Sequence, residues 1–79
     1  MFLTQRKRDI LRALNGRGLD LDELMARFGY RTSGPIHDEL RDLRSLQLVR
    51  LDGRLWELTE RGRRKILHDQ QLELRGISA

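Results

Sequence analysis

The spacing of apolar residues divides the chain into a helical part and a strand part. Up to about residue 47, apolar residues recur three or four positions apart, the period of a helix with one buried face. Over 48–58 the period changes, and Asp52-Gly53 lies between the two halves of this stretch. An Asp-Gly pair favours a type I′ turn, so 48–58 is predicted to form a two-stranded β-hairpin. Trp56 is expected to pack this hairpin onto the helices.

The first two helices are marked at their ends. One is predicted over about 4–15, because Asn15-Gly16 favours a left-handed stop. The next begins after Asp20, since Asp20 and Glu23 have the spacing of a capping box, in which each side chain bonds the other residue's amide. It is short, because Gly29 stands where helices commonly end in a left-handed glycine.

A third helix is predicted over about 34–47, after a short turn. Ser33 offers a side-chain cap, and Pro35 fits the first turn, where its missing amide hydrogen costs nothing. The residues expected in the core are Ile36, Leu40 and Leu43. At about 100° per residue, the opposite face holds Gly34, Asp38, Arg41 and Ser45, with His37 and Arg44 on one flank. The exposed face of this helix is therefore polar throughout.

A fourth helix is predicted after the hairpin. Thr59 is expected to cap it, Glu60 suits its positive end, and its apolar stripe extends to about residue 74. We expect a single domain over 1–75 and a frayed tail over 76–79. The stripe of Leu67, Leu72 and Leu74 is the candidate seam of a homodimer.

The order of these elements gives a mainly α chain with a small β-hairpin, an α+β class. Three helices followed by a hairpin, with a short glycine-containing turn between the second and third helices, are typical of the winged helix-turn-helix plan. At Phe28-Gly29-Tyr30-Arg31-Thr32-Ser33 and on through Leu40, Leu43 and Leu48-Val49, the chain resembles the DNA-binding domain of LexA-type repressors. More loosely, the Leu-Thr-x-x-Gly of 58–62 is similar to the sequence that follows the wing in many bacterial winged-helix regulators.

The resemblance covers about residues 4–62 and implies a small DNA-binding transcriptional regulator, such as a repressor, with its third helix in the major groove. It implies base contacts from the start of that helix, which holds Thr32, Gly34, Pro35, His37 and Asp38. The family's asparagine falls on Gly34 and its glutamate on His37, so the resemblance does not extend to the family's operator.

Composition and charge favour the same partner. The chain has 79 residues, no cysteine and a net charge of +4, and a domain of this size has room for one core but not for a large enclosed substrate pocket. All of its cations are arginine except Lys7 and Lys65, and the planar fork of arginine fits phosphate and guanine. A codon bias of the genome would give the same ratio, so composition alone leaves the partner open.

Base reading is expected from the exposed face of the third helix. Arg41 and His37 lie one turn apart, and arginine reads guanine through two parallel hydrogen bonds. Asp38 either accepts a hydrogen bond from cytosine or indicates that this face binds protein. The alternative for Arg41 is an intrahelical salt bridge with Asp38. Arg44 shares the flank of His37 and joins the predicted DNA-binding residues.

Contacts to the DNA backbone are expected on either side of that helix. Arg31, Thr32 and Ser33 precede it, where a phosphate would meet free helical amides. Arg50 and Arg54 flank the predicted hairpin turn, where a cation contacts the DNA backbone or the minor groove, or else pairs across the strands. The basic cluster of Arg61, Arg63, Arg64 and Lys65 is either a further phosphate contact or a solvated face.

Other functions have less support. Acidic residues outnumber arginines over 34–45, so a protein-interaction module in a larger assembly is the alternative to double-stranded DNA, and RNA is a weaker third. No metal or cofactor is expected, because His37 and His68 have no third ligand at suitable spacing. No enzyme activity is expected, because Ser33 lacks the context of a nucleophile and the sequence has no glycine-rich phosphate loop. No membrane-spanning stretch or signal peptide is evident, so we expect a cytoplasmic protein that lies on the nucleoid when bound to DNA.

Overall fold

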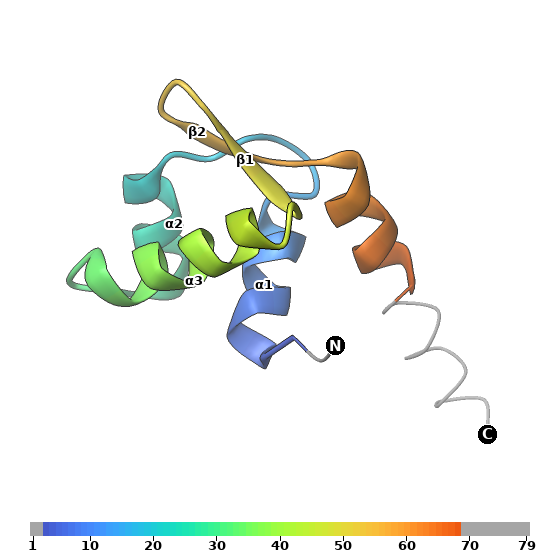
Figure 1. The fold of residues 1–79 in the computed structure, drawn as a ribbon. Helices are drawn as coiled ribbons and strands as arrows, with labels where there is room; N and C mark the ends of the chain where they lie inside the picture. Colours follow the sequence, from blue (N-terminus) through green and yellow to red (C-terminus); the bar gives the residue numbers. More distant parts are fainter. Residues whose placement is uncertain (1–2, 69–79) are drawn as a thin grey trace.

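The computed structural model describes residues 3–68, which form four helices and a two-stranded antiparallel hairpin (Figure 1). In chain order the elements are α1 (Gln5–Ala13), α2 (Leu21–Phe28), α3 (Gly34–Ser45), β1 (Val49–Asp52), β2 (Leu55–Leu58) and a helix over 60–68. The expected α+β class is confirmed. The tail predicted over 76–79, and Leu72 and Leu74 of the predicted dimer seam, lie outside the described residues.

The predicted ends of α2 are confirmed. The Asp20 carboxylate accepts a hydrogen bond from the amide of Glu23 at 2.7 Å, and the Glu23 carboxylate accepts one from the amide of Asp20 at 3.2 Å. Gly29 closes the helix with a left-handed φ of 73°, which glycine adopts without a steric penalty. The chain therefore leaves α2 sharply and reaches α3 after a short turn.

The predicted end of α1 and the predicted side-chain cap of α3 are wrong, although α3 begins at Gly34 as predicted. α1 ends earlier than expected, and Leu14 keeps right-handed angles (φ −84°, ψ −4°), so Asn15-Gly16 provides no left-handed stop. The amide of Asn15 instead donates to the carbonyl of Arg12 in a tight final turn. Ser33 makes no side-chain cap for α3, because its backbone (φ −81°, ψ −17°) is already helical and a capping residue needs extended angles.

The end of α3 is a Schellman motif, in which two amides beyond the helix bond carbonyls of its last turn. The amide of Leu48 donates to the carbonyl of Leu43, and the amide of Gln47 donates to the carbonyl of Arg44. Gln47 has φ 62° and occupies the position where glycine is usual. This left-handed turn ends the helix at Ser45 rather than at the predicted 47 and sends the chain into β1.

The hairpin forms as predicted, but its loop is shifted by one residue. Val49 pairs with Leu58 and Asp52 with Leu55, so Gly53 and Arg54 make the loop. Of these two, Gly53 alone has a positive φ (63°), which is the pattern of a type II′ turn and not of the predicted type I′ turn at Asp52-Gly53. Arg54 consequently stands at the tip of the hairpin.

Trp56 joins the hairpin to the helices, as predicted. Its side chain is 6% exposed and lies in the core. Its amide donates to the carbonyl of Leu19 at 2.8 Å and its carbonyl accepts from the amide of Leu19 at 3.0 Å, so residue 19 extends the sheet beside β2. The sequence pattern did not predict this pairing, because Leu19 is the only residue on its side of the bridge, and one residue shows no periodicity. The core consists of Leu3, Ile10, Leu11, Leu14, Leu19, Leu24, Ile36, Leu40, Leu43, Leu48, Val49, Trp56, Leu58 and Ile66.

Helix 60–68 packs against the start of the hairpin at very close range. The carbonyl of Leu48 accepts a hydrogen bond from the amide of Thr59 at 3.1 Å. The hydroxyl of Thr59 donates to the carbonyl of Gln47 at 2.6 Å and accepts from the amide of Gly62 at 3.1 Å, which is the predicted cap. Gly62 is buried, and a Cβ on it would collide with the carbonyl oxygen of Leu48. The Leu-Thr-x-x-Gly sequence therefore fixes this helix to the hairpin.

Replacing Gly62 with alanine should lower the free energy of unfolding by about 2–3 kcal/mol, because a methyl group must displace the backbone at Leu48, just before β1. Gly16→Ala is the matched control, since a Cβ there meets nothing within 4 Å, and it should change stability by less than about 0.5 kcal/mol. Urea denaturation followed by circular dichroism measures both variants. Similar stability of the two variants would contradict the close packing at Leu48.

Candidate nucleic-acid interface

All residues predicted to contact DNA are exposed in the structure. They are Arg31, Thr32, Ser33, His37, Asp38, Arg41, Arg44, Arg50 and Arg54. The first three form the turn before α3, the next four lie on α3, and the last two belong to the hairpin. The turn lies at one end of α3 and the hairpin rises from the other end (Figure 1).

The exposed side of α3 has two flanks of opposite charge. At about 100° per residue, the buried leucines separate a basic flank from an acidic flank. The basic flank holds His37, Arg41 and Arg44, and the acidic flank holds Glu39 and Asp42. The two flanks differ in their surroundings as well, because α1 packs along the acidic one.

Lys7 of α1 holds the acidic flank of α3. Its Nζ lies 2.7 Å from the Glu39 carboxylate and 3.4 Å from the Asp42 carboxylate. The hydrogen bond to Glu39 raises the pKa of Lys7, and Asp42 adds to this effect, while partial burial acts in the opposite direction. Glu39, whose side chain is 20% exposed, thus helps to fix α1 against α3, whereas Asp42 is 62% exposed and is only partly balanced by Lys7.

Asp38 is the acidic residue at the centre of the outward face of α3. Arg41 Nη2 lies 3.6 Å from its carboxylate, and the two side chains are 69% and 73% exposed. An ion pair that is so open to water contributes little to stability. The predicted intrahelical pair is therefore present, but exchanging it for another partner of Arg41 costs little free energy.

Several of the predicted cations have no side-chain partner in the described part of the chain. These are Arg31, Arg44 and Arg54. Arg50 differs, because its guanidinium lies 3.0 Å from the carboxylate of Glu57 across the hairpin. Arg50 thus pairs across the strands, as the alternative interpretation predicted. The other three arginines are available to bind an anion.

The basic cluster of helix 60–68 forms a separate surface. Arg61 donates to the side-chain oxygen of Gln47 at 3.2 Å, and Arg64 lies 3.6 Å from Glu60. This helix packs beside the C-terminal end of α3, whereas Arg31 precedes the N-terminal end (Figure 1). The cluster is therefore not continuous with the turn over 31–33.

Lys7 was not among the predicted site residues, although it decides which charges of α3 face outward. The signal in the sequence was the angular position of Glu39 and Asp42, which share one flank of the predicted helix. Net charge over 34–45 conceals this division, because it adds residues of both flanks together. The sequence does not show that α1 packs against this flank, so it does not show which acidic residues Lys7 contacts.

Neither a metal site nor a membrane span is present over residues 3–68. No three His, Cys, Asp or Glu side chains in this range come close enough to hold a metal ion, and no helix within it is long and apolar enough to cross a bilayer. Comparisons with protein-family models, curated proteins and solved structures find no match to this chain. A functional proposal must therefore stand on the residues themselves.

Lys7→Met should lower the free energy of unfolding at neutral pH by about 1–2 kcal/mol, because Glu39 would keep a largely buried charge without its partner. Since folding raises the pKa of Lys7, the pair's contribution is complete below the usual lysine pKa of 10.5 and is lost as pH rises through the folded value. The difference between wild type and Lys7→Met should thus be constant from pH 7 to about pH 10 and shrink above it.

Urea denaturation across this pH range measures the effect. Adding Glu39→Gln to Lys7→Met should recover part of the lost stability, because the unpaired charge is then removed. A difference that stays the same well above the lysine pKa would show that Lys7 acts through packing alone.

Proposed function

We propose that this protein is a winged helix-turn-helix module that binds double-stranded DNA, with α3 in the major groove and the hairpin as its wing. The arrangement of elements supports the proposal: a short α2, a sharp turn at Gly29, an exposed polar face on α3 and a following hairpin. The bridge between Leu19 and Trp56 supports it further, because it attaches the hairpin to the helices as a wing requires.

The observation that carries the proposal is the division of charge on α3. The excess of acidic residues over 34–45 argued against DNA, but Lys7 of α1 binds Glu39 at 2.7 Å and also approaches Asp42 at 3.4 Å, so it offsets one of the three acidic charges. The outward and basic sides keep His37, Arg41 and Arg44. Asp38 faces outward beside them, and Asp42 stays exposed at the acidic edge. A surface of this composition suits the edges of bases and the phosphates beside them.

Each contact residue has a distinct role in this proposal. Arg41, His37 and Asp38 read bases, since their side chains project from the outward side of α3. Arg31, Thr32 and Ser33 hold a phosphate where the chain enters α3, and the missing Ser33 cap leaves the first helical amides open to that anion. The arginines that bind the backbone are Arg44, Arg50 and Arg54.

The biological role that fits best is a transcriptional regulator, and most simply a repressor, acting on the nucleoid. Such proteins commonly bind two half-sites as symmetric dimers. Of the predicted seam, Leu67 is 58% exposed on helix 60–68 and is open to a second copy. The resemblance to LexA-type repressors favours this role, while Gly34 and His37 imply a different operator.

Selection of bound sequences from random duplex DNA tests the proposal directly. The affinity for the selected sequence is then measured at about 50 and about 200 mM salt, because phosphate contacts make binding steeply dependent on salt. An enriched motif bound about a thousandfold tighter than random duplex would support sequence-specific recognition. No enrichment, with a Kd weaker than about 0.1 mM at the lower salt concentration, would exclude it.

Arg41→Ala should weaken binding to the selected duplex by about 1–3 kcal/mol and relax the preference at one base position, because a bidentate contact to guanine would be lost. Fluorescence anisotropy with single-base variants of the duplex measures both effects. Arg63→Ala removes an equal charge from helix 60–68, outside α3, and should leave base preference unchanged. An equal loss on every duplex would remove Arg41 from the base-reading residues.

Arg54→Ala should weaken binding to all duplexes by the same factor and lower the salt slope by about one, as loss of one phosphate contact does. Arg50→Ala should have a smaller effect, since the guanidinium of Arg50 is already held by Glu57. Affinities over a salt series give both slopes. An Arg54→Ala variant with unchanged affinity would mean that the hairpin tip does not touch DNA.

The alternative function is a protein-interaction module, and exposed leucines on the hairpin favour it. Leu51 and Leu55 are 41% and 40% exposed. An apolar side chain does not bind phosphate, so their exposure is not explained by DNA-backbone contacts. If these leucines meet a protein partner, Leu51→Ser and Leu55→Ser should reduce capture of that partner while leaving DNA affinity as it was. Absence of DNA selection together with such a loss would favour this function.

A further inference from the structure

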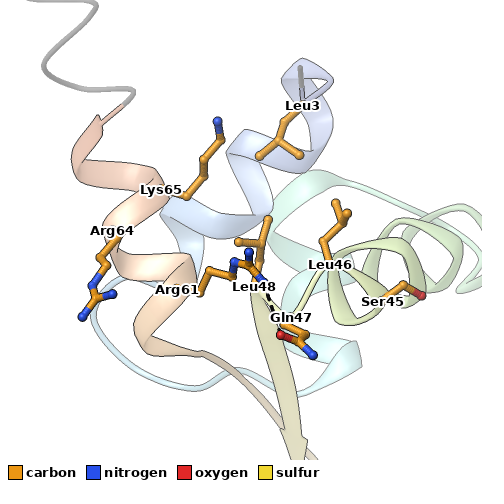
Figure 2. Close-up of a pocket in the computed structure, with 8 residues that line it drawn as sticks. All are labelled: Leu3, Ser45, Leu46, Gln47, Leu48, Arg61, Arg64 and Lys65. Carbon is orange, nitrogen blue, oxygen red and sulfur yellow. Dashed lines mark hydrogen bonds between the residues drawn. The ribbon is translucent and has the colours of Figure 1, made fainter. Parts of the chain in front are cut away.

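A groove of about 660 Å³ lies at the C-terminal end of α3, apart from the proposed DNA-binding face. Its walls are the start of the described chain at Leu3, the connection between α3 and β1, and one face of helix 60–68 (Figure 2). This volume is within the range of pockets that bind small molecules, about 300–1,000 Å³.

The floor of the groove is apolar. Leu3 and Leu48 are core residues whose remaining surface faces the groove, and Leu46 is half-buried beside them. Figure 2 shows Leu3 and Leu46 on the side facing helix 60–68. Apolar surface of this kind favours a ligand with a hydrocarbon body, because contact removes both from water.

The rim of the groove is cationic. Arg61, Arg64 and Lys65 line it from one helix face, and none of the lining residues is acidic. The side chains of Arg61 and Lys65 extend over the groove, whereas Arg64 points away from it (Figure 2). The guanidinium of Arg61 above an apolar floor is complementary to one anionic group on an apolar body, and Lys65 adds positive charge beside it.

Gln47 links the apolar floor to the cationic rim. Its side-chain oxygen accepts a hydrogen bond from Arg61 at 3.2 Å, and its backbone has the left-handed φ described above. The hydrogen bond to Gln47 thus orients Arg61, but the amide of Gln47 is neutral and does not offset the positive charge of the guanidinium. A carboxylate or sulfonate would form a stronger, charge-assisted hydrogen bond with the same guanidinium.

The geometry points to a binding site for an amphipathic organic anion, with an aliphatic or aromatic body on the leucines and its charged group between Arg61 and Lys65. DNA is a poor occupant, because phosphates would gain nothing from the apolar floor. The site is independent of the proposed function, since it uses none of the residues assigned to DNA. Its test therefore needs no DNA, and either proposal can fail alone.

Anilinonaphthalene sulfonate is a suitable probe, because it combines an aromatic body with one fixed negative charge and fluoresces when it leaves water. Phenylnaphthylamine is the matched neutral probe. We expect saturable binding of the sulfonate at one site on the folded, full-length protein and at least about tenfold weaker binding of the neutral probe, the loss expected for a hydrogen bond to a charged group. Decanoate should displace the sulfonate competitively.

The variant Arg61→Gln/Lys65→Gln should weaken sulfonate binding by about tenfold or more and leave binding of the neutral probe unchanged. Arg63→Gln is the matched control, because it removes a charge from the same helix outside the groove, and it should bind both probes as wild type does. Circular dichroism and thermal melting establish that all variants are folded. Equal sulfonate affinity in the double variant and the control would overturn the assignment.

Two other occupants of the groove give different results. If a second copy of the chain fills it, sulfonate binding should fall as protein concentration rises and as the mass measured by sedimentation doubles. If residues 69–79 fill it, Leu72→Ser/Leu74→Ser in the full chain should strengthen binding of both probes. Either result would overturn the assignment to a small organic anion.

Discussion

The carbonyl group of Leu48 is the point on which the relative placement of α3, the hairpin and helix 60–68 depends. Leu48 lies between the Schellman turn of α3 and the first residue of β1, and its carbonyl accepts a hydrogen bond from the amide of Thr59. Gly62 allows the backbone of helix 60–68 to approach this carbonyl, which no larger residue would permit. The three elements therefore meet through backbone groups, whose positions vary less than those of long side chains. Both surfaces discussed above, the exposed face of α3 and the groove behind its end, take their shape from this junction.

Local signals in the sequence predicted most of the fold. The capping box of Asp20 and Glu23, the left-handed Gly29 and the cap at Thr59 act within a few residues, so their geometry follows from residue type and spacing. The errors arose where a local preference met a constraint from elsewhere. Ser33 does not cap α3 because its backbone is already helical, and Gln47 is left-handed without being glycine because Thr59 and Arg61 hold it.

The candidate site was predictable in its residue types but not in its electrostatics. Exposure of Arg31, Arg41 and Arg54 followed from the helical period and the hairpin turn, both of which are local. The role of Glu39 could not be read in the same way, because it depends on Lys7, which lies on another helix and far away in the chain. Summed charge over a segment is therefore a poor guide to the surface that the segment presents. What matters is which charges are already paired across a helix interface.

The pairing of Leu19 with Trp56 has a consequence for the order in which the molecule assembles. α2 packs on α3, its neighbour in sequence, whereas this bridge closes a long loop that includes both α2 and α3. The contact of α1 with α3 through Lys7 and Glu39 closes a second long loop. The entropy lost in closing a loop must be met before the contact contributes any free energy, so distant pairs form after local ones. α2 and α3 should consequently come together first, and the docking of α1 on α3 and of the hairpin on Leu19 should follow.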